Sequence, residues 1–234
     1  MTAMEKVLQS TARALGQSLD DVFADLDRLV DAAIGVILAP GTSRGKLEAL
    51  RPVVEDIVTR QGGLVDSAGV SVAPGLFSDV DAWHQWWSLV GGKLAFIPHN
   101  LNPASINYYD YTEMTWYERP MESGLPELIG PYIDFGGADT RIVTASRPVR
   151  AGTRNVAVAG ADLSMESIER TFLFNLGRTD KDVALVTDSG KVVASNSARF
   201  APGTRLEEDL TCAGAVPVNV AAIASPAWRL IVTA

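Results

Sequence analysis

The spacing of apolar residues changes near Gly63, and this change limits the possible folds more than any other feature of the sequence. Before Gly63, apolar residues recur at intervals of three and four, which is typical of amphipathic helices. The first such run consists of Val22, Phe23, Leu26, Leu29, Val30, Ala33, Ile34 and Ile37. We expect Ser18 to cap this helix and Pro40-Gly41 to end it, and we predict a second helix over residues 47–58.

After Gly63, the pattern is that of short strands separated by Gly, Pro and Asn. Strands are predicted over residues 63–73, 93–99, 141–150 and 155–164, then over a hairpin at 182–196, and finally over 216–224 and 227–234. A short helical turn with three tryptophans is predicted at residues 79–90. A helix that begins after Ser164 and ends at Gly177 separates the two runs of strands.

This order of elements predicts an α+β fold with two antiparallel sheet modules of unequal size. We expect a helical segment over residues 1–62 and a larger, ligand-binding module over residues 63–164. A connecting helix and a smaller, shortened module would then occupy residues 165–234.

Composition excludes several classes of function. The chain has 28 acidic and 20 basic residues and no strip of Lys and Arg, so direct binding to nucleic acid is not expected. Its apolar runs are too short to span a membrane, which takes about 20 residues, so membrane insertion is not expected either. No nucleophile elbow, phosphate-binding loop or metal-binding helix motif is present, which argues against an enzyme and against a cofactor.

Cysteine and histidine are scarce. Cys212 is the single cysteine, so an internal disulfide is excluded, and we expect a small buried apolar side chain there. His84 and His99 are far apart in sequence, and we expect both at the surface or in loops. A metal site built on them is not predicted.

The segment NYYDYTEMTWYERP, residues 107–120, holds five aromatic and three acidic residues but one basic residue. Core aromatics usually lie among aliphatic residues, whereas these lie among polar ones, a mixture that suits a small polar ligand. Other interpretations remain open. Trp116 and Tyr117 could be core residues, Asp162 could serve the following helix as a cap, and Asp134 could be a turn residue.

Several segments, taken in order, resemble a known family. WYERP, GPYIDF, RIVTASRPV and VAVAGADLSMESIE resemble the ligand-binding module of double Cache sensor domains, which are PAS-like. DVALVTDSGKVVASN and WRLIVTA are similar to the second module of that family in a shortened form. The resemblance covers about residues 64–234 and implies two Cache modules in a non-enzymatic small-molecule sensor.

The resemblance also implies a ligand site. Relative to the amino-acid-binding branch, Tyr109, Trp116 and Tyr117 match, while Met114 stands where that branch has an arginine that binds carboxylate. Tyr132, Asp134 and Asp162 match the positions around the ligand's ammonium group. We therefore expect a small amine or amino compound as ligand. Glu113 and Met114 would shape selectivity, and Trp87 or Trp83 would form a lid.

Three alternatives accompany this interpretation. Arg119, Arg141 or Arg147 could reach a carboxylate from another direction, so a small carboxylate is a possible ligand. The aromatic segment could instead be a protein interaction surface with no small ligand, or part of an enzyme with an unfamiliar site.

The location and output partner are predicted from what the sequence lacks. The first residues carry a charge every few positions and no apolar signal segment, so we expect a cytoplasmic protein that acts on a separately encoded regulator or transducer. The alternative is the excised extracytoplasmic sensor domain of a membrane receptor.

Overall fold

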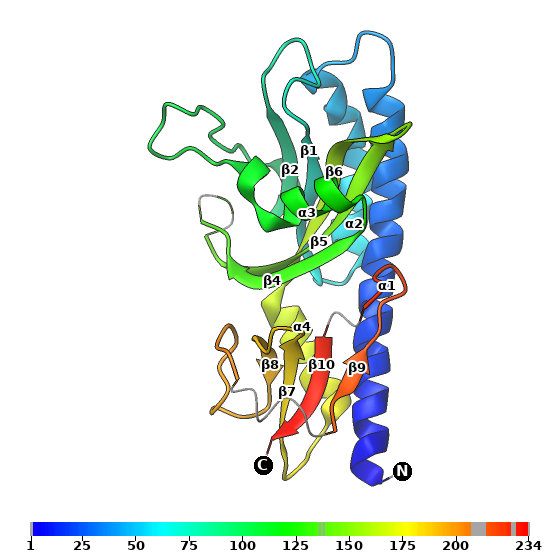
Figure 1. Ribbon diagram of the computed structural model, residues 1–234, viewed down its shortest axis with the longest axis vertical. Coiled ribbons are helices and arrows are strands. Elements are labelled where there is room, and N and C mark those ends of the chain that lie inside the picture. Colours follow the sequence, from blue (N-terminus) through cyan, green and yellow to red (C-terminus); the bar gives the residue numbers. More distant parts are fainter. Residues whose placement is uncertain (1, 136, 138, 207–213, 226–227, 234) are drawn as a thin grey trace. The chain divides into compact units, whose positions relative to one another are not determined.

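A computed structural model describes the whole chain except residues 1, 136, 138, 207–213, 226–227 and 234 (Figure 1). The helices are α1 (Ala3–Ile37), the 3-10 helix η1 (Arg44–Leu50), α2 (Arg51–Arg60), the 3-10 helix η2 (Tyr111–Glu113), α3 (Thr115–Ser123) and α4 (Met165–Leu176). The strands are β1 (Val65–Val72), β2 (Trp83–Val90), β3 (Lys93–Phe96), β4 (Glu127–Ile133), β5 (Arg141–Ala151), β6 (Arg154–Ser164), β7 (Asp182–Thr187), β8 (Val192–Ser195), β9 (Val216–Val218) and β10 (Trp228–Thr233). Cys212, expected to be buried, lies outside the described residues.

These elements confirm the predicted α+β fold. The strands form a six-stranded antiparallel sheet, in the order β3-β2-β1-β6-β5-β4, and a four-stranded antiparallel sheet, in the order β8-β7-β10-β9. Residues 22–129 and 133–163 group into one compact unit, and the remaining described residues group into another.

Helix α1 begins well before Ser18, so the predicted N-cap at Ser18 was wrong. The buried stripe continues toward the N-terminus through Leu8, Leu15 and Leu19. Thr2 and Glu5 cap the helix instead: the Glu5 amide donates to the Thr2 hydroxyl (3.1 Å), and the Thr2 amide donates to the Glu5 carboxylate (2.8 Å). Ser18 lies inside the helix, where its hydroxyl donates to the carbonyl of Ala14 (3.1 Å).

The helical turn predicted for residues 79–90 was also wrong, because Trp83–Val90 forms strand β2. Tryptophans at positions 83, 86 and 87 fit a helical spacing, but aromatic residues also favour strands. Pairing decides between them: β2 aligns with β1 in an unbroken register that includes Gly69 opposite Trp86 and Ser71 opposite His84. Alternate residues of β2 therefore face opposite sides of the sheet.

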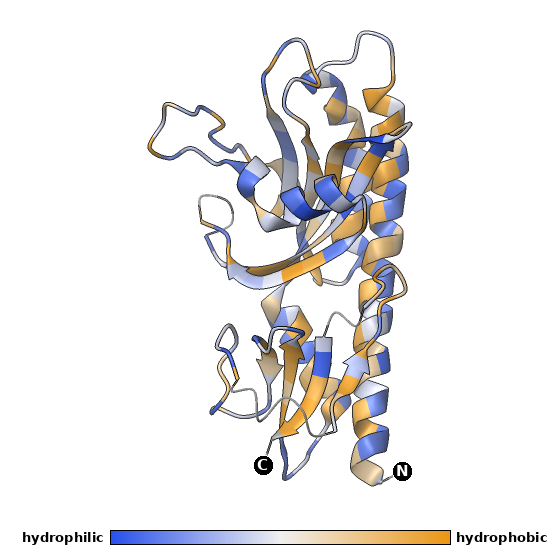
Figure 2. Ribbon diagram, in the orientation of Figure 1, coloured by the Kyte–Doolittle hydropathy of each residue, from blue (hydrophilic) through white to orange (hydrophobic). Residues whose placement is uncertain are grey.

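One face of the six-stranded sheet packs against helices, and we call it the helix face. Helix α2 contacts β1 and β2 there. The Arg147 side chain of β5 lies over the Phe23 ring of α1 at 5.7 Å and donates to Asp27 at 2.8 Å. Figure 2 shows hydrophobic and hydrophilic residues alternating along α1, as expected of a helix that buries one stripe.

The second unit contains the four-stranded sheet and α4, which packs on β8. Two sequence predictions are confirmed here. The Ser164 side chain accepts a hydrogen bond from the Ser167 amide at the start of α4, and Gly177 ends the helix with φ of +66°. Strands β7 and β8 form the predicted antiparallel hairpin. Helix α3 and strand β4 were not predicted.

Candidate ligand-binding site

The face of the six-stranded sheet opposite the helix face is polar and aromatic, and we call it the polar face. Ser67 and Ser71 of β1, His84 and Trp86 of β2, Thr144 of β5 and Asp162 of β6 face this side together, and all six are buried. The register explains the arrangement, because Ser67 lies opposite Asp162 and Ser71 lies opposite His84. Residues opposite each other on neighbouring strands point to the same face.

Asp162 is the charged group at the centre of this face. Its Oδ2 accepts from the Ser67 hydroxyl (2.6 Å) and the Trp86 indole N–H (3.0 Å), and its Oδ1 accepts from the Thr144 hydroxyl (2.8 Å). All three donors are neutral. The pKa of Asp162 is raised to about 6, chiefly by burial and to a smaller extent by the nearby Asp134, while the hydrogen bonds from Ser67, Thr144 and Trp86 act in the opposite direction.

Two glycines make room for the Trp86 indole. Gly69 and Gly160 lie opposite each other on β1 and β6. A Cβ at Gly69 would lie 2.7 Å from an indole carbon of Trp86, and one at Gly160 would lie 2.8 Å from another. The indole therefore lies across both strands and reaches Asp162, which a larger residue at either position would prevent.

His84 is buried rather than at the surface, so the sequence expectation for it was wrong. Because β2 is a strand, position 84 faces the polar face, where its Nδ1 lies 2.6 Å from the Ser71 hydroxyl. Its ring stacks on Trp86 at 4.7 Å and meets the edge of the His99 ring at 4.4 Å. Burial, followed by the proximity of His99, holds the pKa of His84 well below its usual value.

His99 lies in the loop after β3, as expected, but half-buried against Tyr109, with ring centroids 4.6 Å apart. Burial lowers the pKa of His99, and Asp134 partly opposes this. Among the described residues, no group of three or more His, Cys, Asp or Glu side chains could hold a metal ion.

The segment 107–120 folds its rings inward. Asp110 caps η2 by accepting from the Thr112 amide (3.0 Å), and α3 follows directly. Trp116 lies 5.7 Å from Trp86, and the Tyr109 hydroxyl donates to buried Asp134 (3.1 Å). We call His84, Trp86, His99, Tyr109 and Trp116 the aromatic cluster.

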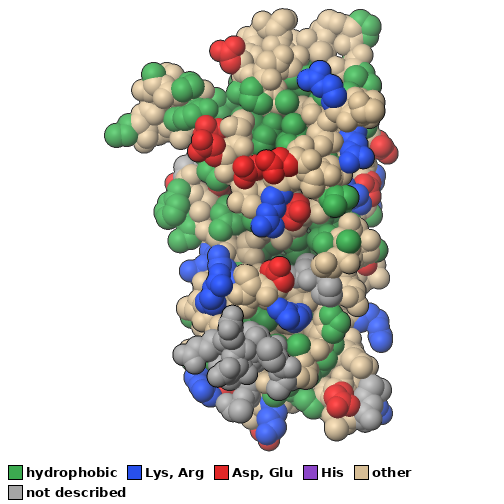
Figure 3. Space-filling view, viewed as in Figure 1, with side chains coloured by type: hydrophobic (Ala, Val, Ile, Leu, Met, Phe, Trp, Pro, Cys, Tyr) green, Lys and Arg blue, Asp and Glu red, His purple; other side chains and the backbone are tan. Residues whose placement is uncertain are grey.

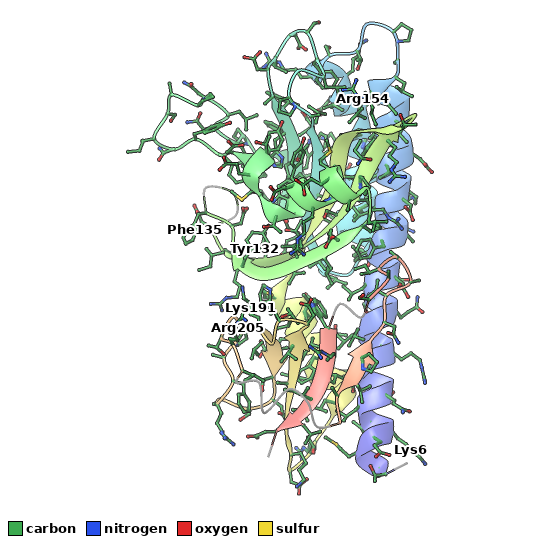
Figure 4. The ribbon with its side chains drawn as sticks, in the orientation of Figure 1. Lys6, Tyr132, Phe135, Arg154, Lys191 and Arg205 are labelled. Atoms are coloured by element: carbon green, nitrogen blue, oxygen red, sulfur yellow. The ribbon has the colours of Figure 1, made fainter. Side chains whose placement is uncertain are left out.

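The structure brings five of the expected site residues to the polar side of this sheet: Tyr109, Trp116, Tyr117, Asp134 and Asp162. The other expected residues have different surroundings. Trp87 is fully buried on the helix face, on the same side of β2 as Trp83 and Gln85. Tyr132, labelled in Figure 4, is half-buried in β4, the edge strand of the same sheet, two residues before Asp134. Met114 is half-buried at the N-cap of α3, and Glu113 is exposed.

The three arginines considered for a carboxylate have different surroundings. Arg147 points to the helix face, where it pairs with Asp27. Arg119 lies 3.7 Å from Glu127 with more than half of its side chain exposed. Arg141 is exposed at the start of β5. In the view of Figure 3, basic side chains are dispersed among acidic ones rather than gathered in a strip.

A surface groove leads to the aromatic cluster. It has a volume of about 690 Å³, and its lining includes Trp83, Asn100, Tyr108 and His99. His99 also contacts His84 and Tyr109. His99 is therefore shared between the open groove and the buried rings.

Comparison with known proteins gives the class of this fold. A family model described as the first PDC sensor domain of methyl-accepting chemotaxis protein-like proteins matches residues 95–170. The ligand-binding domain of the chemoreceptor PctB from Pseudomonas aeruginosa, solved with L-Arg, has a TM-score of 0.65 at 16% identity, over 97% of this chain and 92% of that one. The corresponding domain of PctC from the same organism, solved with GABA, has a TM-score of 0.64 at 16% identity, over 98% and 97%.

A third solved structure, described as the extracellular domain of the histidine kinase mmHK1S-Z3, has a TM-score of 0.68 at 14% identity, over 98% of this chain and 92% of that one. A search of curated protein sequences found no match. These findings show that the chain has the double Cache, or PDC, fold, and they confirm the resemblance seen in the sequence. No helix among the described residues is long and apolar enough to cross a membrane.

Proposed function

We propose that this chain is a Cache-type sensor that binds a small amine or amino compound at Asp162 and the aromatic cluster, and signals to a partner protein. The observation that carries the proposal is the state of Asp162. Its carboxylate is buried and held by three neutral donors, and none of the described Lys or Arg side chains forms an ion pair with it. A ligand ammonium would supply that charge.

The surroundings of Asp162 suit a cation. Oδ1 accepts one hydrogen bond, from Thr144, and a carboxylate oxygen has a second lone pair for an ammonium donor. Rings of Trp86, Trp116 and Tyr109 lie nearby, and a ring face attracts a cation by about 0.5–2 kcal/mol. These rings are buried, which favours an enclosed ligand over a flat protein-binding surface.

The solved relatives support an amine site. PctB was solved with L-Arg and PctC with GABA, and both ligands carry an amino group. Both ligands also carry a carboxylate. In this chain, Met114 offers no hydrogen-bond donor to a ligand carboxylate, and Arg147 points to the helix face. We therefore infer a preference for amines, or for amino compounds with neutral tails, over free α-amino acids.

A thermal-shift screen of amines, amino acids and small carboxylates tests the proposal. A ligand at a hundred times its Kd adds about 2.7 kcal/mol of stability, which is easily measured as a rise in Tm. We expect amines to raise the Tm of the wild type but not of Asp162→Asn. Asp27→Asn, which removes a carboxylate from the helix side, is the matched control and should respond as the wild type does. Stabilisation by carboxylates alone would contradict the proposal.

Met114→Arg tests the inferred selectivity. The new guanidinium should improve binding of an α-amino acid relative to its decarboxylated amine by about tenfold, since a charged hydrogen bond is worth about 1.5–3 kcal/mol. Calorimetric titration of both ligands against both proteins measures this ratio. If the wild type already prefers the amino acid more than tenfold, the role inferred for Met114 is wrong.

Location and output remain part of the proposal. We expect a cytoplasmic protein that signals to a separately encoded regulator. The alternative is a location outside the cytoplasm, since the mmHK1S-Z3 domain is described as extracellular. A cysteine-reactive, membrane-impermeant label applied to intact cells, with a cysteine introduced at exposed Ile106, separates the two. Labelling before lysis would contradict the cytoplasmic prediction.

A further inference from the structure

Two buried hydroxyls on the polar side of the six-stranded sheet have no hydrogen-bond partner among the residues that the structure describes. They belong to Tyr117 of α3 and Ser146 of β5. Tyr117 is 4% exposed, and Ser146 is fully buried. Buried hydroxyls are almost always paired, so two orphans in one unit require an explanation.

Both hydroxyls belong to the side of the sheet that carries Asp162. Ser146 is two residues from Thr144 on β5, so the two side chains point to the same face, and Thr144 donates to Asp162. Helix α3 packs against β5 (Figure 1). The Asn155 side chain of the neighbouring β6 donates to the Met121 carbonyl of α3 (2.8 Å). Tyr117, in the first turn of α3, therefore lies on the same side of the sheet as Ser146.

A neighbouring tyrosine shows that partners are available to hydroxyls in this region. The Tyr111 ring meets that of Tyr117 edge-on at 5.1 Å. Its hydroxyl donates to the Val72 carbonyl (2.7 Å) and accepts from the Trp83 amide (3.2 Å). Phe at position 117 and Ala at position 146 would fill the same space without burying an unpaired oxygen. A packing role therefore explains the ring of Tyr117 but not its hydroxyl.

We propose that Tyr117 and Ser146 form a second subsite, which donates hydrogen bonds to an uncharged oxygen of the ligand while Asp162 holds its ammonium group. This rests on the proposed function and narrows the ligand to amino alcohols and amino amides. Two hydroxyls offer two neutral donors, which suit a hydroxyl or carbonyl oxygen. A carboxylate would bury a second charge, and Arg147, the residue next to Ser146, points to the helix face.

The other orphaned atoms do not belong to this subsite. The indole nitrogen of Trp87 and Nε of Arg147 also lack partners, but both side chains are on the helix face. The proposed subsite therefore consists of the two orphaned hydroxyls on the side of Asp162.

Calorimetric titration with matched ligand pairs tests the subsite. Ethanolamine is compared with propylamine, and 3-aminopropan-1-ol with butylamine, since each pair has the same number of heavy atoms; glycinamide and glycine separate an amide from a carboxylate. We expect the wild type to prefer the oxygen-bearing neutral ligand by about fivefold or more, the value of one hydrogen bond. Tyr117→Phe and Ser146→Ala should each reduce that preference.

The ligand-free Tm provides an independent readout. Because each variant removes an unpaired buried hydroxyl, Tyr117→Phe and Ser146→Ala should keep or raise the Tm of the free protein while they weaken the oxygen preference. Tyr111→Phe is the matched control: it loses a formed hydrogen bond, so it should lower the Tm and keep the preference.

Three results would overturn the subsite. Equal binding of ethanolamine and propylamine by the wild type would exclude it, as would variants that lower the ligand-free Tm and keep the preference. Tighter binding of glycine than of glycinamide would contradict the proposal that the subsite binds an uncharged oxygen. Failure of every amine to bind would instead remove the proposed function, and the subsite with it.

Discussion

The two faces of the six-stranded sheet are both buried, yet they differ completely in chemistry. Strand β1 shows this in one short segment: Ala68, Val70 and Val72 pack on the helix face, while Ser67 and Ser71 bind Asp162 and His84 on the polar face. The neighbouring β6 repeats the contrast with Ala161 and Leu163 on one face and Asp162 on the other.

The difference separates the residues that stabilise the fold from those that serve the candidate ligand site. Apolar side chains on the helix face stabilise the fold by leaving water, and they need no specific partner. Each polar group on the other face is destabilising unless it is paired, and such a face is retained where it serves a site. Substitutions on the helix face should therefore change stability, whereas those on the polar face should change ligand binding and its pH dependence.

The largest effect is expected on the helix face, for Leu163→Ala. Leu163 is fully buried, and removing its side chain should lower the free energy of unfolding by about 2–5 kcal/mol, because a cavity is left. Urea denaturation followed by circular dichroism measures this. Ile106→Ala is the control, since Ile106 is fully exposed and should show little change. A loss below about 1 kcal/mol for Leu163→Ala would contradict the contrast between the faces.

Gly69→Ala should have the next largest effect, and it acts on the polar face. The new Cβ would lie 2.0 Å from the Gln85 carbonyl oxygen and 2.7 Å from the Trp86 indole, so the indole must leave Asp162 or the strands must separate. We expect a destabilisation of about 1–3 kcal/mol together with weaker amine binding. Gly35→Ala has no atom within 4 Å of its new Cβ and should stabilise α1 by up to about 1 kcal/mol. Unchanged ligand binding in Gly69→Ala would argue against a role for the indole.

Local signals were enough to predict many elements. Ser164 and Gly177 mark the ends of α4, and residues 155–164 were identified as a strand from composition and flanking turns. Strand β2 was missed because tryptophans at 83, 86 and 87 are compatible with both a helix and a strand. Only the pairing with β1 distinguishes the two. The long start of α1 was missed because Ser18 resembles a cap, although Thr2 and Glu5 provide a better one.

The candidate site was predicted less completely than the fold. Asp162, Tyr109 and Trp116 were indicated by the family resemblance. Ser67 and Trp86 were missed as partners of Asp162, because that role depends on strand register between residues as far as 95 positions apart. Glycines facing each other at positions 69 and 160 are a signal that could have placed a large ring between them, but only once the register is known.

The third prediction concerns pH. The pKa of Asp162 is raised from 3.8 in the unfolded chain to about 6 in the folded protein, so between about pH 4 and 6 the folded protein keeps a proton that the unfolded chain has lost. Its contribution to stability is thus largest below about pH 4 and decreases as pH rises to about 6. An ammonium ligand requires the ionised form, so its affinity should fall about tenfold per pH unit below pH 6.

Calorimetric titration of the preferred amine from pH 5 to 7.5 measures this dependence. His84 and His99 also face the site, and burial lowers the pKa of each below its ordinary value, which favours their neutral forms. Asp162→Asn, measured for unfolding over the same pH range, isolates the contribution of Asp162 from that of other carboxylates. An affinity that is constant from pH 5 to 7.5 would rule out ionised Asp162 as the group that binds the ammonium.

The smallest predicted effect is the most specific to the polar face. Thr144→Val keeps the shape of the side chain but removes the hydroxyl that donates to Oδ1 of Asp162. One hydrogen bond to a charged group is worth about 1.5 kcal/mol at the low end of its range, and one pKa unit corresponds to 1.36 kcal/mol, so the pH midpoint of amine binding should rise by about one unit. Thr11→Val removes a hydroxyl that donates to the Val7 carbonyl within α1, and it should leave the midpoint unchanged. Equal midpoints in Thr144→Val and the wild type would mean that the hydrogen bonds on this face stabilise the fold and do not tune the charge that binds the ligand.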